Sequence, residues 1–307
     1  MTVKLFSKTP TFDFMGKRWL GFTISGLLTL LSIGLVFTKG LNLGIDFTGG
    51  ILMEIHTEKP TELGRLREAL GKEGFGEVSL QDMGDANSLL IRIQVGETDE
   101  QSKVVAKVKD ALSATVPGNI DYRKIDFVGP TIGDELIEAG VMAVLFSFAA
   151  IMVYVWFRFE WQYGAGAILS LIHDSVMVIG FFAVTQLDFG LPAVAAILTI
   201  IGYSINDTVV IFDRIRENMR RFKKKEVFDL INISINETLS RTILTAGTTF
   251  LAALALALFG GDVIASFSWA MVFGVVVGCY SSIYISAPTL YYMNIRASAQ
   301  EEQEQAV

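Results

Sequence analysis

Six stretches of the chain are almost continuously apolar and long enough to cross a membrane as helices. A helix needs about 20 residues to span the hydrocarbon core of a bilayer. The six stretches lie at residues 19–38, 137–157, 164–184, 191–212, 242–259 and 264–288. The first run, from Trp19 to Phe37, exceeds the roughly 7–15 residues of a signal-peptide core and has no small-x-small cleavage site after it. We therefore expect it to remain as an uncleaved first span.

The segment between the first two spans has the pattern of a folded domain outside the membrane. Residues 61–74 place three leucines on one face of a helix. Residues 98–116 predict a second helix, and Thr98 followed by Gln101 matches a capping box. Strands are predicted at 51–58, 77–84, 88–95 and 119–129. The order strand, helix, strand, strand, helix, strand is that of a ferredoxin-like α+β domain.

Lysine and arginine are distributed unevenly over the links, and this predicts the orientation of the spans. Short cytoplasmic loops carry an excess of both residues. Four basic residues precede the first span, whereas the short links 185–190 and 260–263 have none. Seven basic residues lie in the link between spans four and five: Arg214, Arg216, Arg220, Arg221, Lys223, Lys224 and Lys225. We therefore expect both termini and this basic link in the cytoplasm.

These patterns divide the chain into four parts. Residues 1–38 form a cytoplasmic N-terminus and the first span, and 39–136 an extracytoplasmic domain with its membrane junctions. Residues 137–290 form a five-span membrane domain that includes the basic link 213–241, and 291–307 form a disordered cytoplasmic tail. Within the link, 227–241 is expected to be an amphipathic helix on the membrane surface. The fold class is a polytopic α-helical membrane protein with a small ferredoxin-like domain between spans one and two.

Composition supports the membrane assignment and excludes several function classes. Half of the residues are hydrophobic (51%), and the mean hydropathy is +0.48. A net charge of −7 argues against nucleic acid as a partner. The single cysteine, Cys279, allows no intramolecular disulfide and no Cys-rich metal site, and we interpret it as a packed hydrophobic residue. Small residues recur every fourth position in span six, at Gly274, Gly278 and Ser282, and predict close helix packing.

Asp207 lies inside the fourth apolar stretch, where a carboxylate costs about 2.5–3.5 kcal/mol on insertion scales. Ser204 shares its helix face, and Asn206 flanks it. In a structural role, the carboxylate would pair with Arg241 and hold spans four and five together. In a functional role, Asp207 would take up and release a proton, because acids inside membranes commonly serve proton paths. The relay is the interpretation that we favour.

Other polar residues at membrane depth extend this candidate proton path. Asp174 in span three is a second relay member, a partner for hydroxyl groups, or a hydrogen bonder between helices. His173 beside it points to a different face, and simple packing is expected. Arg241 opens span five and is the candidate counter-ion of Asp207. The hydroxyls of Thr242 and Thr245 either bond to the helix backbone or line a water-filled path.

Glycine-rich segments mark both junctions between membrane and external domain. "NLGIDFTGG" (42–50) follows the first span, and its glycines Gly44, Gly49 and Gly50 permit turns that other residues resist. Asp46 and Thr48 can cap these turns. No Lys-Ser/Thr pair follows the glycines, so a phosphate loop is excluded. The second junction carries the motif residues Gly129 and Pro130.

Three segments together resemble the SecF family, the smaller membrane subunits of the bacterial SecD–SecF export complex. They are "GIDFTGG" after span one, "VGPTIGDEL" (128–136) before span two, and "GYSINDTVVIFDRIREN" (202–218) in span four. The resemblance implies six spans, an external domain between the first two, and a build similar to half of a proton-driven transporter of the RND type. It also implies that Asp207 is the proton-path acid and Arg241 its basic partner.

The resemblance further implies partners and a location. The chain would pair with SecD in the bacterial cytoplasmic (inner) membrane, associate with the SecY–SecE–SecG channel and possible further accessory membrane subunits, and use the proton-motive force to help export preproteins. No cofactor is expected. The coupling ion would be H⁺, and Na⁺ coupling through the same carboxylate and hydroxyls is an alternative.

Two other functions compete with this one. An RND-type exporter of small hydrophobic molecules would carry a second six-span half and a large porter domain, and neither is present in this sequence. A scaffold subunit without a proton role would tolerate Asp207→Asn. An enzyme is not expected, because the external domain offers only the lone His56 and no nucleophile–base grouping.

Overall fold

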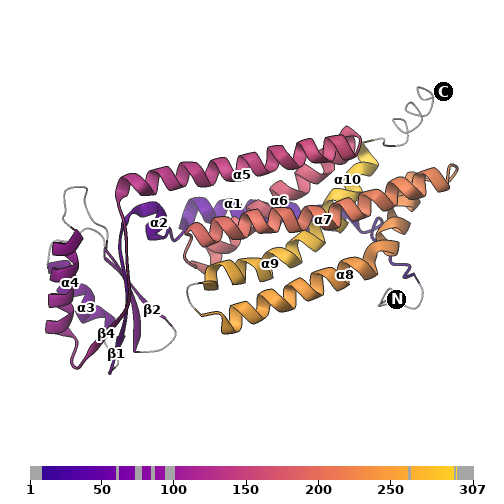
Figure 1. Cartoon of the computed structure of the whole chain (residues 1–307). Coiled ribbons are helices and arrows are strands. Elements are labelled where there is room, and N and C mark those ends of the chain that lie inside the picture. The colour runs from indigo at the N-terminus through magenta and orange to yellow at the C-terminus, as the bar shows by residue number, and fades with distance from the viewer. Residues whose placement is uncertain are drawn as a thin grey trace. The chain divides into compact units, whose positions relative to one another are not determined.

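The computed structural model describes residues 9–59, 62–72, 78–83, 87–93, 101–261, 264–293 and 295. The chain forms two compact units (Figure 1). One holds Leu43–Met142 and contains the sheet. The other holds Met1–Asn42 and Ala143–Val307 and contains the apolar helices. The helix α5 (Pro130–Arg158) begins in the first unit and continues in the second.

The sheet unit has the predicted ferredoxin-like topology. Its strands are β1 (Gly50–Thr57), β2 (Val78–Asp82), β3 (Ser88–Ile93) and β4 (Ile120–Val128), in the antiparallel order β2-β3-β1-β4. The helices α3 (Leu63–Lys72) and α4 (Gln101–Thr115) pack on one face of this sheet (Figure 1). Each predicted strand and helix is found within a few residues of its expected bounds. Residue 98 of the expected capping box and most of the turn at 85–87 lie outside the described residues.

Strict alternation of apolar residues builds the core of this unit. Ile51, Met53 and Ile55 of β1 are fully buried, whereas the residues between them are only half-buried. They pack with leucines of the two helices, Leu66 and Leu70 among them. Because side chains alternate across a strand, this pattern fixes which face of β1 meets the helices.

Six described helical segments are long and apolar enough to cross a membrane, as predicted. They are α1 (Arg18–Lys39), α5 from Ile132, α6 (Trp161–Thr185), α7 (Leu191–Arg221), α8 (Val227–Phe259), and a final run made of α9 (Ala265–Ser281), η2 (Ser282–Ser286) and α10 (Ala287–Tyr292). Figure 1 shows α6, α7, α8 and α9 lying alongside one another. The helices α6 and α9 are the most buried of the six, whereas α1 and α5 expose large apolar side chains of the kind that contact lipid or a partner subunit.

The expected surface helix at 227–241 is not a separate element. It is the first half of α8, which runs without interruption into the predicted fifth span. Its apolar residues Ile231 and Ile235 are buried against Phe212 and Ile215 of α7. Because these side chains find protein partners, they do not need the membrane surface. The helix α7 also extends to Arg221, so the non-helical link is much shorter than predicted.

Candidate functional site

The middle of α7 presents one buried polar face. Ser204, Asp207 and Thr208 are each at most 2% exposed. Asp207 and Thr208 follow Ser204 by three and four positions, so the three residues share one face of α7. This face is turned toward the neighbouring helices. Asn206, which the sequence added to the path, lies on the exposed side, and its side chain makes no hydrogen bond to another described residue. The structure therefore does not bring Asn206 into the cluster.

Close packing of α9 on α7 creates this polar face. A Cβ atom at Gly278 would lie 3.1 Å from Cβ of Ser204, and one at Gly274 would meet Ile200 at 2.3 Å. Only glycine at these two positions lets the helix backbones approach so closely. The predicted stripe of small residues is therefore the contact surface between α9 and α7.

Asp174 is fully buried and is held by three helices. Ser204 of α7 and Ser281 of α9 both donate hydrogen bonds to its Oδ2, at 2.6 and 2.8 Å. His173 Nδ1 lies 3.0 Å from its Oδ1, so the expectation of mere packing for His173 is wrong. Ser170 in turn donates to Ser281 at 3.0 Å. This carboxyl group is well supplied with donors, as a buried polar group must be.

Asp207 has much weaker contacts. Thr245 Oγ1 of α8 lies 3.5 Å from its Oδ1, and Cys279 Sγ of α9 lies 3.5 Å from its Oδ2. The interpretation of Cys279 as a packed hydrophobic residue is therefore incomplete, because its thiol faces the carboxyl group. Two residues later in α9, Ser281 bonds Asp174, so this helix contributes a side chain to each acid.

The sequence left open whether Asp207 touches its candidate counter-ion Arg241, and in the structure the two side chains do not form an ion pair. Among the described residues, no acid lies within 4.0 Å of the Arg241 guanidinium, although this cation interacts with Asp207 at longer range. The side chain of Arg241 is exposed and lines a groove of about 390 Å³ with Asp213, Glu217 and Glu237. The guanidinium of Arg241 is therefore solvated in this groove and does not lie beside the Asp207 carboxyl group.

The threonines of α8 behave differently from one another. Thr245 also bonds the backbone carbonyls of Arg241 and Thr242, as expected for helical threonines. Thr242 is buried, and its hydroxyl has no hydrogen-bond partner in the part of the chain that the structure describes. A buried hydroxyl without a partner costs free energy, and it is a position where a water molecule or an ion could be held.

The α9–η2 region contributes residues that the sequence did not single out. Ser281 bonds Asp174, and Ser282 bonds Thr208 of α7 at 2.8 Å. Directly after Ser281 the helix widens into the π-helical turn η2, a feature that often occurs at functional sites. Three consecutive polar residues after Cys279 in an apolar run, Tyr280 to Ser282, were the available signal.

No group of three or more His, Cys, Asp or Glu side chains that could hold a metal occurs among the described residues. The polar residues around Asp174 and Asp207 form one cluster. It contains two buried carboxyl groups, one imidazole, one thiol and several hydroxyls, distributed over α6, α7, α8 and α9. Such groups donate and accept protons without a cofactor.

The first glycine junction contains a single helical turn, α2 (Ile45–Thr48), which includes Asp46. Gly44 precedes it, and Gly49 and Gly50 follow with φ angles of 67° and 121°. Other residues rarely adopt these angles, so the glycines are required for β1 to start where it does.

The second junction packs against the first. Gly129 accepts hydrogen bonds from the first turn of α5, which opens at Pro130. A Cβ at Gly133 would lie 2.8 Å from the carbonyl oxygen of Phe47 in α2. The two predicted junctions therefore form one closely packed joint.

Comparison with known proteins agrees with these features. The family described as "Protein export membrane protein SecD/SecF, C-terminal" matches residues 107–296, and the "SecD/SecF GG Motif" matches residues 34–61. The chain is 50% identical over 288 residues to the protein translocase subunit SecF of Rickettsia bellii, covering 94% of this chain and 95% of that relative. It is also 50% identical over 279 residues to SecF of Rickettsia prowazekii, covering 91% of this chain and 90% of the relative.

Solved structures give the same result. The crystal structure of SecDF from Thermus thermophilus, described as a translocon-associated membrane protein, superposes with a TM-score of 0.86 at 36% identity. The match covers 95% of this chain and 40% of that chain. A second SecDF structure, in a super-membrane-facing form, gives a TM-score of 0.70, covering 98% of this chain and 41% of that one. This chain thus spans about two fifths of the SecDF chains. It belongs to the SecF family of protein translocase subunits.

Proposed function

We propose that this chain couples the proton-motive force to polypeptide export, and that Asp207 carries the proton. The observation that supports this most is the environment of Asp207. The carboxyl group is 2% exposed in a candidate membrane-spanning helix, and among the described residues it has no cation within 4.0 Å and two polar contacts, each of 3.5 Å. An ionised carboxylate there would lack the partners that buried charges require. Taking up a proton removes this mismatch.

The change in charge would act on the contact between α7 and α8. When Asp207 is ionised, it attracts the Arg241 guanidinium, which the present arrangement leaves in the groove. When it is protonated, that attraction is lost. A proton that crosses the membrane releases about 2.3 kcal/mol per 100 mV. This amount is sufficient to bias two helix arrangements that differ by a few kcal/mol.

Asp174 would act as a second, fixed position on the path. Its bonds to Ser204 and Ser281 hold the carboxyl group between α6, α7 and α9, and Cys279 lies near both acids. The unpaired hydroxyl of Thr242 and the hydroxyl of Thr245 would bind the waters that supply protons to Asp207. Asn206 lies on the exposed side of α7, so we assign it no direct contact with Asp207 on this path.

The names of the relatives support a transport role with SecD as partner. We propose that the pair works beside the SecY–SecE–SecG channel on preproteins that are already engaged there. The charge distribution favours the bacterial cytoplasmic membrane with both termini and the basic link on the cytoplasmic side.

The test replaces Asp207 with Asn in membrane vesicles that contain the export machinery and SecD. We expect Asp207→Asn to co-purify with SecD and to lose the part of export that an imposed proton gradient stimulates. The matched control is Asp229→Asn, the same change at an exposed acid in the first turn of α8, away from the groove that Arg241 lines. That control should retain stimulation. Full stimulation in Asp207→Asn would refute the proposal, and stimulation by a Na⁺ gradient alone would identify Na⁺ as the ion.

A further inference from the structure

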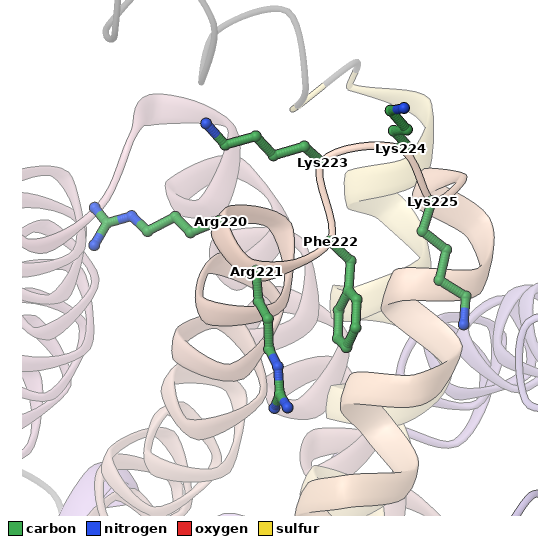
Figure 2. A pocket seen from close by; sticks show the side chains of 6 residues that line it. All are labelled: Arg220, Arg221, Phe222, Lys223, Lys224 and Lys225. Carbon is green, nitrogen blue, oxygen red and sulfur yellow. The ribbon is translucent and has the colours of Figure 1, made fainter.

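The short link between α7 and α8 concentrates positive charge at one end of the membrane helices. Five of its six residues from 220 to 225 are basic, and they line a hollow of about 520 Å³ together with Phe222 (Figure 2). The next residue, Glu226, is the only acid within this stretch of seven. The hollow is therefore strongly cationic.

These cations are not used in ion pairs. Among the described residues, none of the five has an acidic partner within 4.0 Å, although Arg221 interacts with Glu237 at longer range. The nearby Arg158 and Arg214, in contrast, each bind a carboxylate at 2.6 Å. The structure thus pairs the basic residues that hold helices together and leaves those of the link open to an external anion.

Phe222 gives the hollow an apolar component. Its ring lies 5.2 Å from the Arg221 guanidinium carbon and 5.9 Å from Lys225 Nζ. Figure 2 shows Arg221, Phe222 and Lys225 extending in the same direction beside the helices, while Arg220 and Lys223 extend elsewhere. The Phe222 side chain is 37% exposed. An aromatic ring between two cations matches a ligand that has both a negative group and a hydrocarbon part.

The position of the link selects the ligand. It directly follows α7, a candidate membrane span of 31 residues, of which about 20 suffice to cross the hydrocarbon core. The link therefore lies outside the core, on the side of the lipid headgroups. Clusters of four to eight basic residues at this depth attract anionic lipids, at about 1 kcal/mol per residue. We propose that residues 220–225 bind the headgroup of an anionic phospholipid, with Arg221 and Lys225 on the phosphate and Phe222 against the glycerol and upper acyl chain.

A simpler explanation is that these charges only set the orientation of the helices. Orientation depends on the number of basic residues near a span and not on their arrangement. It requires neither an exposed aromatic residue between two cations nor a shared hollow. The two explanations therefore differ in one respect, because only a binding site discriminates between headgroups.

The experiment measures lipid binding by native mass spectrometry of the purified full chain in complex with SecD. The lipids are phosphatidylglycerol, which is anionic, and phosphatidylcholine, which is not. We expect phosphatidylglycerol to bind at least tenfold more tightly, with affinity that falls as salt is raised, because salt screens exposed charges. The triple variant Lys223→Gln/Lys224→Gln/Lys225→Gln should weaken binding of phosphatidylglycerol about hundredfold, given about fivefold per lysine. Phe222→Ser should weaken binding of the lipid but not its preference for the anionic headgroup.

The matched control is Lys103→Gln/Lys107→Gln/Lys109→Gln in α4, which removes the same charge from the sheet unit and should leave lipid binding unchanged. Thermal unfolding of each variant verifies the fold. Equal binding of the two lipids, or equal loss in both triple variants, would overturn the proposal. So would complete competition by millimolar inorganic phosphate, because that result would indicate a site for free phosphate. Unchanged lipid binding with loss of SecD from the link variant would indicate an acidic protein surface instead.

Discussion

At the scale of single residues, the two buried acids of the membrane unit have opposite surroundings. Asp174 accepts two short hydrogen bonds from serines and contacts a histidine. Asp207 has only two contacts of 3.5 Å. A group that is bound tightly in one arrangement stabilises that arrangement, whereas a group that is bound loosely can change its partners at little cost. We therefore propose that Asp174 holds the helices in position, whereas Asp207 is the acid that changes its partners.

Replacing each acid by asparagine should therefore have different effects on stability. In Asp174→Asn, an amide must accommodate two serine donors on one oxygen, and we expect a loss of about 1–3 kcal/mol. Asp207→Asn should leave the melting temperature nearly unchanged, because few good bonds are lost. Thermal unfolding of both purified variants measures the difference, with Ser170→Ala as a milder control on the same network. Equal melting temperatures for the two asparagine variants would contradict the contrast.

Sequence reasoning identified both acids and their neighbours Ser204 and Thr245, but not the roles of the neighbours on α9. An acid inside an apolar run is visible because its burial is costly. Ser281 and Cys279 carry no such signal, because single serines and cysteines are common in membrane helices. Their proximity to the acids depends on how α9 is rotated against α7, and periodicity within one helix does not determine rotation between two helices. The same limitation explains why the sequence could not decide whether Arg241 touches Asp207.

At the scale of elements, glycines on α9 set the distance to α7. A valine at Gly278 would press on Ser204, the residue that bonds Asp174. We expect Gly278→Val to lower stability by about 1–3 kcal/mol through overpacking. Gly202→Val is the matched control, because a Cβ at Gly202 meets nothing within 4 Å. Thermal unfolding distinguishes them, and an equal effect of the two valines would show that this contact is not tight.

The elements themselves were largely predictable. Apolar runs of membrane length and alternating strands leave strong periodic signals, and both the six spans and the ferredoxin-like order were confirmed. The fusion of residues 227–241 with the fifth span was not predicted. A helix that buries an apolar face in protein and one that buries it in lipid have the same periodicity, so only tertiary contacts, such as Ile235 against α7, separate them.

At the scale of the whole molecule, the six candidate spans among the described residues fit the proposed orientation, with the start of α1 and the basic link on the cytoplasmic side. The proposed orientation can be tested with single cysteines at two exposed positions, Ser113 in α4 and Lys224 in the basic link. In intact cells, a membrane-impermeant maleimide should label Ser113→Cys, and it should label Lys224→Cys only after permeabilisation. The parent chain, whose Cys279 is half-buried among helices, is the control for background labelling. The reverse labelling pattern would invert the orientation.

The close approach of Gly133 to Phe47 has a consequence for how such proteins can diversify. The chain enters the sheet through α2 and leaves it through the first turns of α5. The backbones of these two segments are already in contact. A segment whose two ends meet can be exchanged for another, because its replacement does not alter the distance that the rest of the chain must bridge. The segment between these contacts, residues 50–128, whose first and last residues pair in the sheet, is in this sense an interchangeable module, and a larger or smaller domain could begin and end at the same joint.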